Sequence, residues 1–339
     1  MVTSILQMSM PRKRRLTRAR LALMLLLLPT PAVAAPRRVD LGGLVLSVSD
    51  APTAQIFHIV DQLSLWDPFT HKEYARWAEK TQLLDQGDRE LLRKHAELRK
   101  TRGWGKGLEQ TFLVDDSIER AAAKGVAAGL LTEQEASTER DILLHFAPKL
   151  EPLMRRRQVA IGAVEDQLVA QKNQLTPLVE QLAHFAQVEQ PPTIEVFLVA
   201  NAEDLNGGGG ANGGRLVVEV PLEDPIGTLL HESLHQLLRP REEAIKAAAE
   251  STGVDFIVLK EGIAYALSPG ITGDTDQGDR LVEQLVQMQL HGTPESDPFL
   301  KFDQMAVVLR PLLRAVLAHH ETITTFLPKV TAKWRRIAP

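Results

Sequence analysis

The sequence contains no cysteine and no internal repeat, and it has only one long apolar run, near its start. Without cysteine the chain can form neither a disulfide framework nor a lipid-modified cysteine at a processed N-terminus. Beyond Leu28 no apolar run approaches the length of about 20 residues that spans a bilayer. The protein must therefore be held together by its hydrophobic core or by a bound metal ion.

The first 34 residues have the pattern of a secretory signal peptide. Six basic residues lie between Arg12 and Arg20, and an apolar run from Leu21 to Leu28 follows them. Ala32-Val33-Ala34 supplies the small residues that a signal peptidase requires, so we expect cleavage after Ala34. The alternative is an uncleaved N-terminal anchor. The pattern predicts an exported bacterial protein, either periplasmic or secreted, without a stable membrane span after cleavage.

Basic residues are in deficit once the signal segment is removed. The chain has 39 Lys and Arg against 43 Asp and Glu. Removing the six basic residues of the signal leaves 33 against 43, a net charge of −10. This balance argues against a nucleic-acid partner or an anionic membrane surface.

The N-terminal region, residues 35–150, is predicted to be mostly helical. Residues 38–49 alternate around Gly42-Gly43 and predict a short hairpin or a bent strand. From Ala51 onward the apolar residues recur at helical spacing, beginning with Ile56, Ile59, Val60 and Leu63. Further helices are expected at about 72–84, 88–100, 117–129, 132–146 and 151–182, the last in one piece or broken near Pro177.

Two strands flank a glycine-rich stretch after Pro191-Pro192. Thr193–Val199 and Arg215–Val220 are rich in β-branched residues and alternate in polarity. The stretch between them, 206–214, holds six glycines and predicts a flexible hairpin loop rather than a ligand cradle, since it lacks the Lys-Ser/Thr ending of a phosphate-binding loop.

The rest of the chain is predicted to be helical. Asp224-Pro225 is a typical helix start, and that helix should run to Leu238. Helices are also expected at about 241–251, 256–267, 280–290 and 298–318, the last kinked at Pro311, with a polar loop at 271–278. These elements together predict an α+β fold that is mostly helical.

The helix that Asp224-Pro225 opens carries His231-Glu-Ser-Leu-His235. Two histidines four residues apart share one helical face and can direct two imidazole nitrogens at one cation. Glu232 lies on an adjacent azimuth, from which its carboxylate can accept a proton from water at the metal. The alternative is an amphipathic helix with two histidines and no metal.

A catalytic zinc ion needs a third protein ligand and one open position. The metzincin arrangement would require a glycine and a histidine where this chain has Leu238 and Arg241, so it is excluded. Glu261, in Leu259-Lys-Glu-Gly-Ile-Ala-Tyr-Ala266, is the better candidate, because the intervening residues suffice for a helix, a turn and a returning helix. Gly262 and Ala264 would let that helix pack closely on the histidine helix. The alternative is that Glu261 is a solvated acid beside Lys260.

H-E-x-x-H followed by E-G-x-A resembles the gluzincin metallopeptidases, over about Thr193–Ala266. The resemblance implies a zincin-like catalytic domain at 151–339, in which the histidine helix packs under a small twisted sheet. It implies zinc ligands His231, His235 and Glu261, with Glu232 as general base. It also implies that Arg215–Val220 lies at the edge of the cleft, where a peptide substrate would add by strand pairing.

The resemblance leaves one role without a clear residue, the donor that stabilises the transition state. Tyr265 stands where thermolysin-like enzymes have an acidic residue, and its hydroxyl could support a ligand or stabilise an oxyanion. Ordinary packing of Tyr265 is the alternative. His291 and the pair His319-His320 are further candidates. Glu242 and Glu243 are expected on the surface, and Asp274 and Asp276 are weak alternative ligands.

These observations predict a peptidase that binds one zinc ion per chain and hydrolyses peptide or protein substrates. Two other readings stay open. One is an exported zinc-binding protein without hydrolytic activity, such as an assembly or inhibitor-like module. The other is a helical interaction protein in which H-E-S-L-H occurs by accident. Chelator-sensitive cleavage of a peptide library would distinguish the peptidase from the zinc-binding protein without hydrolytic activity.

Overall fold

The computed structural model describes residues 35–202, 208–212, 214–271 and 298–337. The description below concerns the unit that comprises Pro36–Pro339. The predicted signal peptide therefore lies outside the described residues, as do the predicted loop from 272 onward and the helix at 280–290. Within the described part of the chain, no helix is both long enough and apolar enough to cross a membrane.

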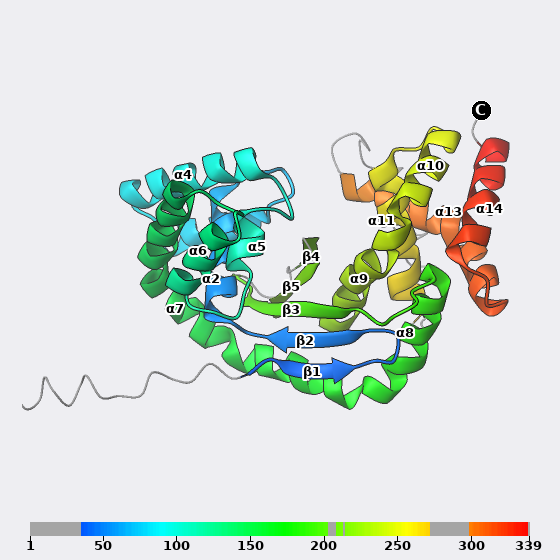
Figure 1. Ribbon diagram of the computed structural model, residues 1–339, viewed down its shortest axis with the longest axis horizontal. Helices are drawn as coiled ribbons and strands as arrows, with labels where there is room; N and C mark the ends of the chain where they lie inside the picture. Colours follow the sequence, from blue (N-terminus) through cyan, green and yellow to red (C-terminus); the bar gives the residue numbers. More distant parts are fainter. Residues whose placement is uncertain (1–34, 203–207, 213, 272–297, 338–339) are drawn as a thin grey trace, which may run out of the picture. The chain divides into compact units, whose positions relative to one another are not determined.

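A five-stranded mixed sheet forms the centre of the molecule (Figure 1). Its order is β1-β2-β3-β5-β4, and the strands comprise Arg37–Asp40 (β1), Val45–Ser49 (β2), Thr193–Ala200 (β3), Gly209–Asn212 (β4) and Arg215–Val220 (β5). β2, β3 and β5 are parallel, while β1 and β4 pair antiparallel at the two edges. The predicted hairpin at 38–49 and the two predicted strands are confirmed.

The glycine-rich stretch corrects one expectation. β4, inside that stretch, pairs antiparallel with β5, so β5 lies between β3 and β4. The expectation that Arg215–Val220 forms the cleft edge is therefore wrong, because β4 occupies that edge. The expected flexible loop is wrong for Gly209–Asn212, which is a strand. Small residues leave the β4 backbone free to approach its neighbours closely.

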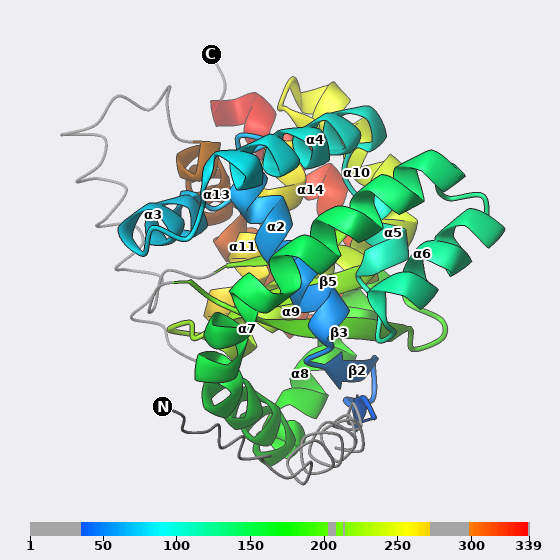
Figure 2. The same cartoon turned by 90° about the vertical axis from the view of Figure 1, so that its left-hand side faces the viewer.

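Successive side chains of a strand point to opposite faces of the sheet, and a separate hydrophobic core packs on each face. Ile194, Val196 and Leu198 face a cluster formed with helices that lie between residues 161 and 330. Phe197 and Val199 face a second cluster, formed with helices that lie between residues 51 and 154. Figure 2 looks at the molecule from the side of this second group, whose helices lie in front of the sheet. With both faces covered, the strands are fixed in register and can position side chains firmly.

The helices have the following bounds: Pro52–Ser64 (α2), Lys72–Lys80 (α3), Gln86–Arg102 (α4), Leu108–Phe112 (α5), Ile118–Ala127 (α6), Glu133–Ala170 (α7), Lys172–Ala186 (α8), Pro225–Leu238 (α9), Glu242–Thr252 (α10), Phe256–Ile271 (α11), Pro298–Ala318 (α13) and Ile323–Ile337 (α14). A short 3-10 turn, Arg239–Arg241, joins α9 to α10. α9 begins and ends where the sequence predicts, and the side chain of Asp224 caps it by accepting a hydrogen bond from the backbone N–H of Gly227 at 2.8 Å.

The long helix α7 differs from the prediction of two helices that meet near residue 147. It continues through Pro148 and Pro152, because its buried face is unbroken across Phe146, Leu150 and Leu153. The break comes at Gln171, and Pro177 lies inside α8. The predicted division at residue 150 thus falls within a helix, and the N-terminal region contributes β1 and β2 to the same sheet as β3.

A buried network of charged side chains ties α2, α4, α5 and α7 together. His95 contacts Glu139 through Nδ1 at 2.8 Å and Asp61 through Nε2 at 3.0 Å. Arg99 donates from Nε to the same Asp61 at 2.6 Å, and it also binds Glu109. All five side chains are buried. We call them the Arg99 network.

We expect the free energy of unfolding to fall as the pH rises from about 6.5 to about 9. Burial alone would lower the pKa of His95, but Glu139 and Asp61 raise it to about 9. The folded protein therefore keeps a proton that the unfolded chain releases above 6.5. The stabilisation is complete below that pH and is lost as the pH rises through the folded-state pKa, in total about 3 kcal/mol.

Urea unfolding of chelator-treated protein across this pH range measures the effect, since zinc binding has a pH dependence of its own. His95→Gln should flatten the slope in this window. His319→Gln, at an exposed position, is the matched control and should leave the slope as in the wild type. A wild-type stability that does not change between pH 6.5 and 9 would contradict the assignment.

Candidate metal centre and its cavity

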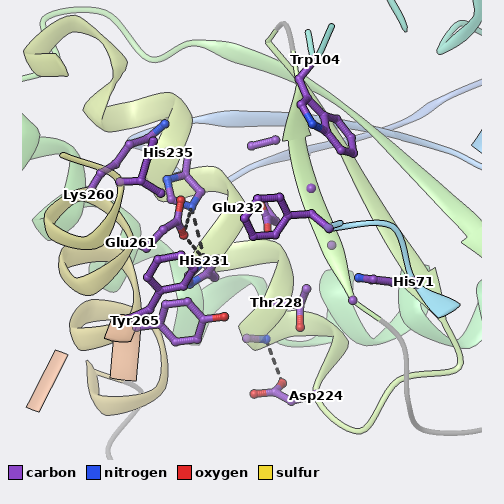
Figure 3. A pocket seen from close by; sticks show the side chains of 18 residues that line it. His71, Trp104, Asp224, Thr228, His231, Glu232, His235, Lys260, Glu261 and Tyr265 are labelled. Carbon is purple, nitrogen blue, oxygen red and sulfur yellow. Dashed lines mark hydrogen bonds and ion pairs between the residues drawn. The ribbon is translucent and has the colours of Figure 1, made fainter. Parts of the chain in front are cut away.

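α9 and α11 bring the three predicted metal ligands together. His231 and His235 lie one turn apart on α9, and Glu261 lies on α11, which packs directly against α9. The two histidine Nε2 atoms are 3.3 Å apart, and Oε2 of Glu261 is 3.6 Å from the first and 3.2 Å from the second. Figure 3 shows the three side chains converging on one point. The predicted cluster is thus present in space.

The expected reason for the close packing needs correction. A Cβ on Gly262 would lie 2.3 Å from Cγ of Met305 on α13, so the missing side chain allows α11 to approach α13 rather than α9. The contact between α9 and α11 rests instead on buried apolar residues of both helices, among them Leu230, Leu234 and Ile263.

The three ligand atoms have the spacing that zinc requires. Tetrahedral zinc with ligands at 2.0–2.2 Å places neighbouring ligand atoms about 3.3–3.6 Å apart. The separations of 3.2–3.6 Å match this range. Two imidazole nitrogens and one carboxylate oxygen are also the donor set of several catalytic zinc sites. Burial alone would raise the pKa of Glu261, but His231 and His235 bring it well below its ordinary value, which keeps the carboxylate ionised as a ligand must be.

Glu232 lies beside this cluster and outside it. Its side chain lines the same cavity as His231, His235 and Glu261, and only 8% of Glu232 is exposed. Burial, with a smaller contribution from Glu261, raises the pKa of Glu232 to about 7, against the opposing effect of His231. β4 covers Glu232 closely, since a Cβ on Gly209 would lie 3.0 Å from its Cγ. The glycine at 209 is what allows the edge strand to reach α9.

Tyr265 packs against the metal cluster. It lies one turn beyond Glu261 on α11, and its ring centroid is 4.6 Å from that of His231, with an interplanar angle of 69°. The ring therefore restricts the rotamer of His231. Tyr265 also lines the cavity, beside Phe302 of α13. Both predicted uses of this residue, as packing and as a hydroxyl donor, are compatible with its position.

The cavity has a volume of about 740 Å³, and its second side comes from the N-terminal region. His71 and Trp104 face α9 and α11 across it (Figure 3), and Phe69, two residues before His71, also lines it; we call these three residues the opposite wall. The sequence analysis did not identify them. Phe69 and His71 follow α2, and Trp104 follows α4, in loops that carry no periodic pattern.

A buried carboxylate holds His71 in place. Glu219 of β5 is 1% exposed, and its carboxylate contacts Nδ1 of His71 and Nε2 of His58, each at 2.7 Å. It also accepts a hydrogen bond from the backbone N–H of Gly208 at 2.9 Å. Burial alone would lower the pKa of His71, but Glu219 raises it above its ordinary value. The alternation of β5 could have revealed Glu219, because it shares a face with the buried Val217.

The remaining candidates lie away from the cavity or outside the described residues. His291, Asp274 and Asp276 are outside the described residues. His319 and His320 follow α13, where the backbone carbonyl of His320 is 2.9 Å from Nε2 of His184, and neither lines the cavity. Glu243 is exposed, as expected. Glu242 pairs with Lys260 at 3.3 Å, and Lys260 lines the cavity beside Glu261.

Comparison of the chain with protein-family models finds no match. Searches among curated proteins and among solved structures find no match either. The functional argument therefore depends on the motif and on the geometry of these side chains.

Proposed function

We propose that this chain is an exported zinc metallopeptidase. The observation that carries the proposal is the triangle of candidate ligand atoms with tetrahedral spacing, with the buried carboxylate of Glu232 in the same cavity. His231, His235 and Glu261 would hold the zinc ion. When bound, zinc supplies Lewis acidity, which acidifies water and polarises a carbonyl group.

Glu232 would transfer the proton. Its carboxylate, buried in the same cavity as the three candidate ligands, would accept a proton from the attacking water and return it to the leaving amine. Burial beside the metal cluster excludes bulk water from this transfer. The carboxylate lies on the same helix as the two histidines, so its position relative to them is fixed by the helix itself.

His71 and β4 would orient the substrate. Nδ1 of His71 is occupied by Glu219, which leaves Nε2 as the ring nitrogen able to donate a hydrogen bond to a substrate oxygen. β4 is one of the two edge strands of the described sheet, and Gly208–Ala211 line the cavity. An extended peptide could therefore pair with β4 and pass in front of Glu232.

We expect purified protein to contain about one zinc ion per chain and to cleave a mixed peptide library in a chelator-sensitive manner. Elemental mass spectrometry and peptide mass spectrometry measure the two quantities. Zinc without cleavage would favour a non-hydrolytic zinc-binding module, the alternative function. Failure to retain zinc after the metal is offered and the excess removed would overturn the metal site and make the H-E-S-L-H match accidental.

A further inference from the structure

Exposed apolar side chains gather at the cavity. The described residues expose seven large apolar side chains, and three of them line this one cavity: Phe69 (48% exposed), Trp104 (37%) and Ile257 (44%). Isolated exposed apolar residues are common, but a group of them around one cavity indicates a binding site. Phe69 and Trp104 both belong to the opposite wall.

The Arg99 network holds the loop that carries Trp104. The guanidinium of Arg99 donates to the carbonyl of Gly103 at 2.9 Å, and the N–H of Gly105 donates to Glu109 at 2.6 Å. The residues on both sides of Trp104 are therefore bound to one buried network. Both glycines have a positive φ, of 72° and 70°, which other residues rarely adopt, so the tight turn depends on them.

The indole ring of Trp104 also contacts Arg99 and Trp66. Cζ of Arg99 lies 5.2 Å from the ring centroid of Trp104 and 4.3 Å from that of Trp66. The two indole rings are 4.7 Å apart. A ring held by a cation, a second ring and a fixed loop is preorganised to bind a ligand without loss of its own freedom. The Arg99 network therefore positions Trp104 in addition to its pH-dependent contribution to stability through His95.

A small recess of about 60 Å³ opens between the opposite wall and β4. Its apolar lining includes Phe57, Leu113 and Val217. The acidic groups at its base, Asp61 and Glu109, are already paired with Arg99. The protonated form of His71, which Glu219 favours, would repel a cationic side chain. The recess is therefore better suited to an apolar side chain than to a basic one.

We propose that Phe69 and Trp104 form a subsite that selects peptides with a large apolar side chain beside the scissile bond. This inference rests on the proposed peptidase function. Figure 3 shows Trp104 directed into the cavity, facing the residues of α9 and α11. The N-terminal region thereby sets the specificity of a site whose metal ligands all come from the C-terminal half of the chain.

A series of fluorogenic peptides that differ at one position tests the proposal. The wild type should prefer Phe or Leu over Ala at the residue beside the cleaved bond by about 10-fold or more in kcat/KM. Trp104→Ala and Phe69→Ala should each remove most of this preference, with zinc content unchanged. Leu144→Ala, at an exposed position of α7 that does not line the cavity, is the matched control.

The role of Arg99 as a positioning residue has a separate readout. Arg99→Lys keeps the positive charge but loses the several N–H donors with which the guanidinium binds Asp61, Glu109 and the carbonyl of Gly103. KM should therefore rise for the Phe peptide, with kcat little changed. Phe69→Ala provides an independent test should variants of the network fail to fold. A preference for Lys or Arg peptides, or a preference that survives both alanine variants, would overturn the subsite. A wild type that cleaves no peptide would overturn the peptidase function, and this inference with it.

Discussion

Glu232→Gln should lower kcat for peptide hydrolysis by about 10²–10⁴-fold and leave about one zinc ion bound per chain. Glutamine has nearly the shape of glutamate but cannot accept and return a proton. The side chain lies outside the triangle of ligand atoms, so its replacement removes no zinc ligand. Steady-state kinetics on a cleaved peptide, with elemental analysis of the same sample, measure both quantities.

The same substitution should not weaken the fold. Burial raises the pKa of Glu232, so the buried negative charge is itself unfavourable, and a neutral amide removes that cost. Thermal unfolding of the variant should therefore occur at or above the wild-type temperature, and a loss of activity could not be ascribed to misfolding. Glu243→Gln, at an exposed position on α10, is the matched control. Undiminished turnover by Glu232→Gln would exclude this residue as the general base.

Glu261→Ala should weaken zinc binding by about 100-fold or more, because loss of an outer-shell partner alone typically costs 10–100-fold. The variant would leave two imidazoles to hold the ion, and it would remove the only carboxylate of the described residues that lies with both histidines. Competition with a chromogenic chelator at fixed pH measures the affinity.

Zinc should also stabilise the wild type more than this variant. A ligand that binds only the folded state raises the unfolding temperature in proportion to its free-energy contribution. The difference between zinc-loaded and chelated samples should therefore shrink in Glu261→Ala, and Glu243→Ala should keep the full difference. Equal zinc affinity in Glu261→Ala and wild type would show that another group completes the site.

The metal cluster is the part of the site that sequence predicts best, since its geometry is mostly local. Helix α9 has a clear start at Asp224-Pro225, and helical periodicity alone places His231 and His235 on one face. The prediction of Glu261 as a ligand required one further assumption, that the helix carrying it packs back against the helix with the two histidines. α11 does so, and the cluster forms as expected.

The opposite wall could not be predicted in this way. Trp104 and His71 lie in loops without a periodic pattern, and the position of His71 depends on its contact with Glu219, far along the chain. No local pattern encodes a contact of that kind. The sheet edge was missed for a different reason, because a run of glycines indicates a loop by composition and β4 forms through pairing with β5.

The predicted helix boundary near residue 147 was wrong. Pro148 and Pro152 predict a break, but the apolar face of α7 continues past them and its burial outweighs the lost backbone hydrogen bonds. α14 was not predicted at all. Its β-branched residues and its internal Pro328 favour non-helical structure, and packing of Phe326 against Phe185 overrides that local preference.

The two walls of the cavity differ in how far apart in the sequence the residues lie that must come together to form them. The candidate metal ligands span only 31 residues, from 231 to 261, whereas the cavity that Trp104 lines with them brings together residues more than 100 positions apart, from 104 to 231. Loop-closure entropy makes the longer contact the more costly one to form. The proposed zinc site can therefore form early in folding and the proposed subsite late, so an incompletely folded molecule would bind zinc without discriminating among substrates.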